Sequence, residues 1–339
     1  MQTTTGRQHV VDVALSDRSA ISVGATARNR VLDRLRFGDS VFHWLTWAAA
    51  ILVLLLLSGV IGSLAWGSIP ALQTFGFGFL ISSSWNPVTE KFGALPAVYG
   101  TVLTSFIAML IAVPVGLMIA FFLTELCPQW LRRPIGIAIE LLAGIPSIIY
   151  GIWGLFIFAP FLQATLQPAL IDTLGNVPGI GSLFAGPPYG IGILTSGLIL
   201  AIMVLPFITS ISRDVFEAVP AVLKEAAYGL GCTTWEVMRN VVLPYCRVGV
   251  IGGVMLALGR ALGETMAVTF IIGNSFRISS SIFAPGTTIS AAIASEFAES
   301  DGLHQSGLIL LGLLLFVLTF FVLAAARLML MRLEKKAGN

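Results

Sequence analysis

The sequence is poor in charged residues. Only 11% of its 339 residues are Asp, Glu, Lys or Arg, whereas about 25% is usual for a soluble domain. Hydrophobic residues make up 56%, and the mean hydropathy is +0.92. These values exclude an ordinary soluble domain. They predict an all-α polytopic membrane protein, because backbone polar groups in lipid must be satisfied within helices.

The sequence also has few residues suited to metal binding or nucleophilic chemistry. Its three histidines are scattered, and its three cysteines match no zinc-site spacing. It contains no G-x-x-x-x-G-K-[ST], H-E-x-x-H or G-x-S-x-G motif. We therefore expect no metal, no cofactor and no enzymatic activity in this chain. If ATP drives the protein, a partner subunit must bind the ATP and Mg.

Six apolar segments are long enough to span a membrane, which requires about 20 residues each. We expect six transmembrane helices at 44–66, 100–123, 135–160, 190–211, 248–274 and 307–330. The connections at 66–99 and 161–189 are then long loops on one side.

Lysine and arginine are distributed unevenly among the connecting segments. The N-terminal tail, the connection at 132–133, the region 213–247 and the C-terminal end carry nearly all of them. The opposite side carries only Lys91 and Arg277. Because positively charged loops remain in the cytoplasm, we predict that both termini and the region 213–247 are cytoplasmic.

A polar stretch at 224–244 separates the fourth and fifth apolar segments. Its pattern predicts two short helices, interrupted at Gly229 and Gly231. Thr233 and Glu236 have the spacing of a capping box, which would begin the second helix, and Pro244 would end it. A folded helix pair on one face of a membrane protein indicates a surface for a partner.

The fifth apolar segment contains two charged residues, Arg260 and Glu264. Their i, i+4 spacing predicts that they share one helix face, near the middle of the bilayer. A charge at that depth costs about 2.5–3.5 kcal/mol on insertion scales, so Arg260 must face the protein interior or a polar path. A guanidinium binds tetrahedral oxyanions through paired hydrogen bonds. We therefore interpret Arg260 as part of an anion path in which Glu264 holds it in place and prevents tight trapping of the anion.

Two simpler interpretations remain open at this point. Arg260 and Glu264 can neutralise each other and hold helices together without contacting a substrate. Glu140, early in the third apolar segment, can line the exit of the path, but it can equally accept a hydrogen bond from a neighbouring helix or lie at the interface.

The polar stretch resembles the EAA loop of ABC-importer permeases. The residues that match are Glu225, Ala226, Ala227, Gly231, Leu243 and Pro244. In that family the loop docks into a groove on the cytoplasmic ATPase. Further stretches, GIAIELLAGIPS, IYGIWGLFIFAP and GRALGETMAVTFIIGN, are similar to permease subunits of the high-affinity bacterial phosphate importers. The similarity runs from about residue 40 to residue 335.

This resemblance implies a type I importer fold in the bacterial inner membrane and a role as the permease of an ATP-driven phosphate importer. The implied partners are a second permease, PstA, two copies of the ATPase PstB, the periplasmic phosphate-binding protein PstS and membrane lipid, with no nucleic acid. Residues 1–40 are polar and have no clear apolar period, so we expect a flexible cytoplasmic tail there, longer than the family resemblance leads us to expect. We expect the first helix and external loop at 41–98, and the permease domain at 99–332 with its coupling loop at 213–247.

Two other functions are compatible with parts of the sequence. A secondary transporter could use Glu264 and Glu140 as proton carriers, although it would not need a folded EAA loop. A membrane scaffold or sensor would explain that loop but not the buried charge of Arg260.

Overall fold

The computed structural model describes residues 41–336, which include no strand, and the predicted tail at 1–40 lies outside them. Six described helices are long and apolar enough to cross a membrane, as predicted. They are Val41–Phe75, Leu95–Leu126, Ser147–Leu174, Ile193–Glu217, Thr234–Leu262 and Gly302–Leu328. The residues fall into two compact units, one up to Ser63 and one from Leu64 onward. Everything described below belongs to the second unit.

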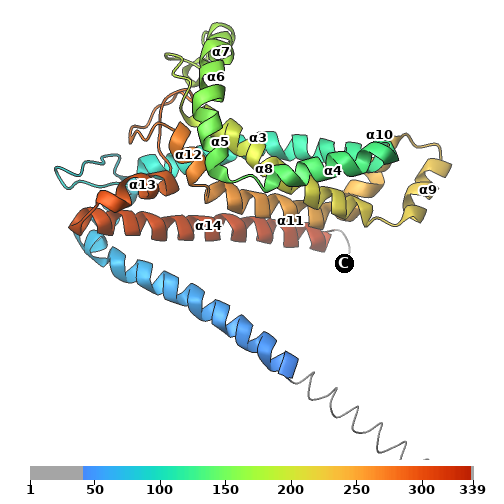
Figure 1. The fold of residues 1–339 in the computed structure, drawn as a ribbon, viewed down its shortest axis with the longest axis horizontal. Helices are drawn as coiled ribbons and strands as arrows, with labels where there is room; N and C mark the ends of the chain where they lie inside the picture. The colour runs from blue at the N-terminus through green and yellow to red at the C-terminus, as the bar shows by residue number, and fades with distance from the viewer. Residues whose placement is uncertain (1–40, 337–339) are drawn as a thin grey trace, which may run out of the picture. The chain divides into compact units, whose positions relative to one another are not determined.

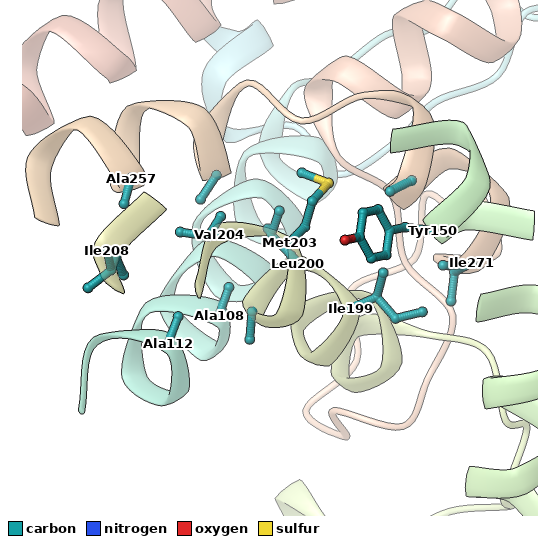
Figure 2. Close-up of a cluster of buried hydrophobic side chains, with 13 residues drawn as sticks. Ala108, Ala112, Tyr150, Ile199, Leu200, Met203, Val204, Ile208, Ala257 and Ile271 are labelled. Carbon is teal, nitrogen blue, oxygen red and sulfur yellow. The ribbon is translucent and has the colours of Figure 1, made fainter. Parts of the chain in front are cut away.

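The centre of the second unit is the pair α3 (Leu95–Phe121) and α8 (Ile193–Glu217), which pack along each other. Small residues allow this close packing. A Cβ added at Gly197 would lie 2.7 Å from Ile107, and one at Gly116 would lie 2.8 Å from Ile208. Figure 2 shows the buried cluster around this pair, in which Tyr150 and Met203 lie near each other.

The third apolar segment is not one helix, so the predicted span at 135–160 is wrong. Helix α4 (Gln129–Ala143) ends at Gly144, and α5 (Ser147–Trp153) begins after Pro146. Proline disfavours a helical residue before it, which separates the two helices. The Tyr150 hydroxyl donates to the Leu142 carbonyl oxygen at 2.9 Å and holds the ends together.

The helix that begins at α5 continues into part of the connection that we expected to be a loop at 161–189. It runs through η2 (Gly154–Phe158), α6 (Ala159–Ala164) and α7 (Leu166–Leu174). In Figure 1 these elements form a column that projects away from α3 and α8. The third membrane-spanning helix is therefore Ser147–Leu174, and α4 is not part of it.

The fifth helix starts and ends earlier than predicted. It runs through α10 (Thr234–Val237), η4 (Met238–Val242) and α11 (Leu243–Leu262). The break at 263–265 then precedes α12 (Met266–Ile271), so the expected single helix at 248–274 is wrong.

Pro244 does not end the second short helix of the polar stretch, contrary to the prediction. It lies in the first turn of α11, directly after the π-helical turn η4. In that turn the Leu243 N–H bonds to the Met238 carbonyl oxygen, five residues back. The widened turn shifts the backbone hydrogen bonds beside the proline. The helix therefore continues although Pro244 has no N–H to donate.

Helix α9 (Ala221–Gly229) lies with α10 at one end of α3, α8 and α11, and α13 (Ile289–Glu296) lies at the other (Figure 1). Helix α14 (Gly302–Lys336) then runs back along α11. The shorter elements are α2 (Gly78–Ile81), η1 (Phe122–Leu126), η3 (Gly181–Leu183) and η5 (Phe297–Glu299).

Candidate functional site

The polar stretch at 224–244 contains the two predicted helical segments. Helix α9 ends at Gly229, and Gly231 adopts φ +86°, a conformation that favours glycine. The Thr233 hydroxyl accepts from the Glu236 N–H at 3.4 Å, and the Glu236 carboxylate accepts from the Thr233 N–H at 2.8 Å. The predicted capping box is therefore confirmed.

Most of the residues that match the EAA motif face outward. Glu225, Ala226, Gly231 and Pro244 are exposed, whereas Leu243 is half-buried and Ala227 is buried. Ala227 belongs to an apolar cluster with residues of α8 and the fifth helix, so one face of α9 packs on the membrane-spanning bundle while the other stays open.

Large apolar side chains are also exposed along this stretch. The exposed fraction is 72% for Val222, 86% for Leu230 and 60% for Trp235. Exposed apolar groups gathered on a polar segment are typical of a protein–protein contact. The part of the predicted coupling loop at 213–247 that contains these residues runs from Ala221 to Pro244, and we keep the name coupling loop for this part; its coupling role remains a prediction.

Arg260 lies in the last turn of α11, three residues before the break in the fifth segment. Its guanidinium carbon is 4.5 Å from the centroid of the Phe207 ring on α8. Its Nε atom is buried and has no hydrogen-bond partner among the described residues. The guanidinium therefore retains hydrogen-bonding capacity in a half-buried position.

Glu264 does not share a helix face with Arg260, so that prediction is wrong. Helix α11 ends at Leu262, and Gly263 follows as its C-cap. The Glu264 carboxylate accepts a hydrogen bond from the Ala267 N–H at 3.4 Å, and its backbone carbonyl accepts from the Ser290 hydroxyl at 2.6 Å. Among the described ion pairs, none joins Arg260 to Glu264.

The break at 263–265 is itself informative. Backbone carbonyl groups that leave a helix need other hydrogen-bond partners where water is scarce. Here the Ser290 hydroxyl satisfies the Glu264 carbonyl, and the Thr265 hydroxyl donates to the Gly263 carbonyl at 3.2 Å. Arg260 thus lies beside a polar interruption of its helix.

Glu140 is separate from Arg260. It lies on α4, where its carboxylate accepts from the Arg213 guanidinium of α8 at 2.9 Å. Both line a surface depression of about 310 Å³, and the other lining residues are Gln129, Arg132, Arg133, Ile137 and Glu217. The depression includes neither Arg260 nor Glu264. The structure agrees with the simpler interpretation, a bond to a neighbouring helix.

A cavity of about 440 Å³ lies beside α11 and α14 but does not suit an anion. Its lining is Leu64, Gly259, Gly263, Gly312, Leu315, Phe316, Thr319, Phe320 and Leu323. The Thr319 hydroxyl, its one polar side-chain group, bonds to the Leu315 carbonyl of its own helix. No described group of His, Cys, Asp and Glu side chains has the arrangement of a metal site either.

Two features of the site were not predicted from the sequence. Phe207 lies within an apolar run, where nothing distinguishes it from lipid-facing or core aromatic residues. The ammonium of Lys224 pairs with the Glu125 carboxylate, 99 positions away in the chain. Opposite charges on distant segments make such an ion pair possible, but the sequence does not show which acidic residue pairs with Lys224.

The sequence matches a known family model over most of its length. Residues 112–335 match the model described as binding-protein-dependent transport system inner membrane component. The chain is 66% identical over 322 residues to the phosphate transport system permease protein PstC of Mesorhizobium japonicum, covering 95% of this chain and 98% of that relative. It is 58% identical over 300 residues to the PstC of Pasteurella multocida, covering 88% and 94% respectively.

The fold also resembles solved structures. A chain of the bacterial alginate ABC transporter, in complex with a pentasaccharide-bound periplasmic protein, superposes with a TM-score of 0.58. The match covers 86% of this chain and 95% of that chain, at 15% sequence identity. At this level of identity the likeness concerns the fold alone.

Proposed function

Because the chain belongs to the family of binding-protein-dependent transport system inner membrane components, we propose that it forms half of a phosphate translocation path. It is a multi-pass membrane permease with the type I ABC importer fold, and ATP hydrolysis takes place in a partner. The cargo is inferred from the names of relatives that are 58–66% identical over most of their length.

The observation that carries the proposal is the state of Arg260. Its charge is half-buried in a membrane-spanning helix, is not neutralised by Glu264 and keeps a hydrogen-bonding atom without a partner. A charge within a membrane-spanning segment is costly, which makes the residue a candidate for a functional role. A guanidinium offers paired hydrogen bonds to a tetrahedral oxyanion, which suits phosphate.

Glu264 and Glu140 have different roles in this proposal. Glu264 lies four residues after Arg260 and lowers the net positive charge of the path, so that a bound phosphate can leave again. The Glu140 carboxylate is bonded to Arg213, and both side chains line the depression beside α4. In this proposal Glu140 lines the exit of the path only in a state in which that bond is open.

The coupling loop is the proposed contact with the ATPase. Its open face presents Glu225 and Ala226 together with exposed Val222, Leu230 and Trp235. Closure of two ATPase copies on ATP would draw this loop toward its counterpart on the second permease. The attached spans would then open outward, and hydrolysis would return them to the inward-open state.

Orientation and partners follow from the same reasoning. The arginine-rich tail and the coupling loop are cytoplasmic, in the bacterial inner membrane, because positive charges concentrate on that side. The partners are the second permease PstA, two copies of the ATPase PstB and the periplasmic binding protein PstS. This chain needs no cofactor of its own, and ATP with Mg belongs to the ATPase.

The test is ATP-dependent uptake of labelled phosphate by the complete complex in proteoliposomes. The complex with Arg260→Gln should assemble normally, but its rate of phosphate uptake should fall about 10–100-fold. This range corresponds to the free energy of hydrogen bonds to a charged group. Arg277→Gln, at an exposed position outside the spans, is the matched control and should keep uptake.

Normal uptake with Arg260→Gln would remove this residue from the path. Uptake without ATP would instead favour a secondary transporter, and no phosphate flux by the wild-type complex would favour a scaffold.

A further inference from the structure

A single ammonium group connects three elements at the end of the bundle that carries the coupling loop. Lys224 lies on α9, directly before Glu225. Its Nζ is 2.5 Å from the Glu125 carboxylate on η1 and 3.4 Å from the Phe216 carbonyl oxygen near the end of α8. The coupling loop is therefore bonded to the ends of both the second and the fourth membrane-spanning helices.

This pair is well shielded from solvent. The side chain of Lys224 is 18% exposed and that of Glu125 is 11% exposed. Phe216, near the end of α8, and Ala227, on α9, are buried in one apolar cluster. An ion pair with little solvent around it is stronger than a surface pair, and loss of one partner leaves an uncompensated charge.

Helix α9 is packed on one side only. Its inner face packs on α10 and η4, at the start of the fifth membrane-spanning helix, and joins the apolar cluster that includes Phe216, whereas its outer face is exposed. The chain on either side of α9 is a natural pivot, since Pro220 precedes the helix and Gly231 follows it in a left-handed conformation. A force on the outer face could turn α9 about these points.

We propose that the Lys224–Glu125 pair transmits the movement of the coupling loop to the second membrane-spanning helix. This inference rests on the proposed function and makes Lys224 and Glu125 positioning residues for transport. Helix η1 continues α3, and α3 packs along both α8 and α11. Helix α11 carries Arg260, so displacement of α9 reaches the Arg260 region through packed helices.

The test measures phosphate imported per ATP hydrolysed by the complete complex in proteoliposomes. Lys224→Met and Glu125→Gln should each lower this ratio by about tenfold, while ATP hydrolysis continues. A tenfold change corresponds to the interaction free energy that is usual between two contacting residues. The double exchange Lys224→Glu with Glu125→Lys restores opposite charges and should return the ratio to within about threefold of the wild-type value. Lys91→Met, at an exposed lysine outside the coupling loop, is the control for loss of a lysine charge.

Several outcomes would overturn the proposal. An unchanged ratio in the single variants would mean that the pair transmits nothing. A double exchange no better than the single variants would mean that pairing is not what matters. Failure of the single variants to bind the ATPase would assign the pair to building the docking surface instead. Absence of phosphate uptake by the wild-type complex would overturn the proposed function and this inference with it. Wild-type uptake together with an unchanged ratio in the single variants would overturn this inference alone.

Discussion

The guanidinium carbon of Arg260 lies 4.5 Å from the centroid of the Phe207 ring, and this contact joins α11 to α8. A ring face attracts a cation by about 0.5–2 kcal/mol, more where the pair is desolvated, but it satisfies none of the guanidinium hydrogen bonds. The contact therefore orients Arg260 and leaves its N–H groups able to bind an anion. A carboxylate at the same position would compete for those groups.

The first prediction concerns the ring of Phe207. Phe207→Leu keeps an apolar side chain but removes the ring face, so Arg260 loses an attraction of about 1 kcal/mol. We expect phosphate uptake by the complete complex to fall by roughly fivefold, with the complex still assembled. The measurement is the initial rate of labelled phosphate uptake in proteoliposomes at fixed ATP.

Phe207→Tyr is the matched control because it retains the ring. It should transport at nearly the wild-type rate. Equal rates for Phe207→Leu and Phe207→Tyr would show that the ring face contributes nothing to transport.

The number of spans and the capping of the coupling loop could be predicted because both depend on local signals. Apolar length sets the span count, and the Thr233–Glu236 capping box is a short-range pattern that the structure reproduces. Helix boundaries were predicted less well. The break at 263–265 has a single glycine as its local signal, and the continuation of the fifth helix through Pro244 depends on the π-helical turn before it.

The contacts of the charged residues could not be predicted in the same way. The i, i+4 spacing predicted that Arg260 and Glu264 share one helix face. Helix α11 ends at Leu262, however, so Glu264 is not part of the helix that carries Arg260. Glu140 pairs with Arg213 only because α4 lies against α8, and a Cβ at Gly136 would come within 2.7 Å of that guanidinium. Such pairs depend on how helices pack, and helix packing is a long-range property.

A second prediction uses the two glycines of the coupling loop. Gly231→Ala places a Cβ on a residue with φ +86°, which should destabilise the loop by about 1 kcal/mol. Gly229→Ala is the matched control, because neither glycine has an atom within 4 Å of its added Cβ and Gly229 lies at the end of a helix with negative φ. Hydrogen–deuterium exchange of the α9 amides should become faster in Gly231→Ala and stay equal or become slower in Gly229→Ala. Equal exchange in the two variants would contradict the argument from φ.

A third prediction concerns the contact between α3 and the segment before α13. A Cβ at Gly100 would overlap the Thr287 carbonyl oxygen, and the Ile289 N–H donates to the Thr101 hydroxyl at 2.9 Å in the same place. Gly100→Ala must separate two backbones and should destabilise the protein by about 1–3 kcal/mol. The measurement is the thermal unfolding midpoint of the purified complex. Gly252→Ala, in α11 with open space around its Cβ, should leave that midpoint unchanged or raise it.

The last prediction concerns Glu225, whose side chain is exposed and has no partner among the described ion pairs. Because a surface charge reversal usually changes stability by no more than about 0.5 kcal/mol, Glu225→Lys should leave the permease folded. If the coupling loop contacts the ATPase, the same variant should weaken ATPase binding by tenfold or more, roughly 1.4 kcal/mol, or separate ATP hydrolysis from transport. Co-purification of the ATPase and the phosphate-to-ATP ratio distinguish these two results. Glu299→Lys, an equally exposed position at the other end of the bundle, should change neither quantity. Wild-type binding and ratio in Glu225→Lys would show that this carboxylate has no part in the contact.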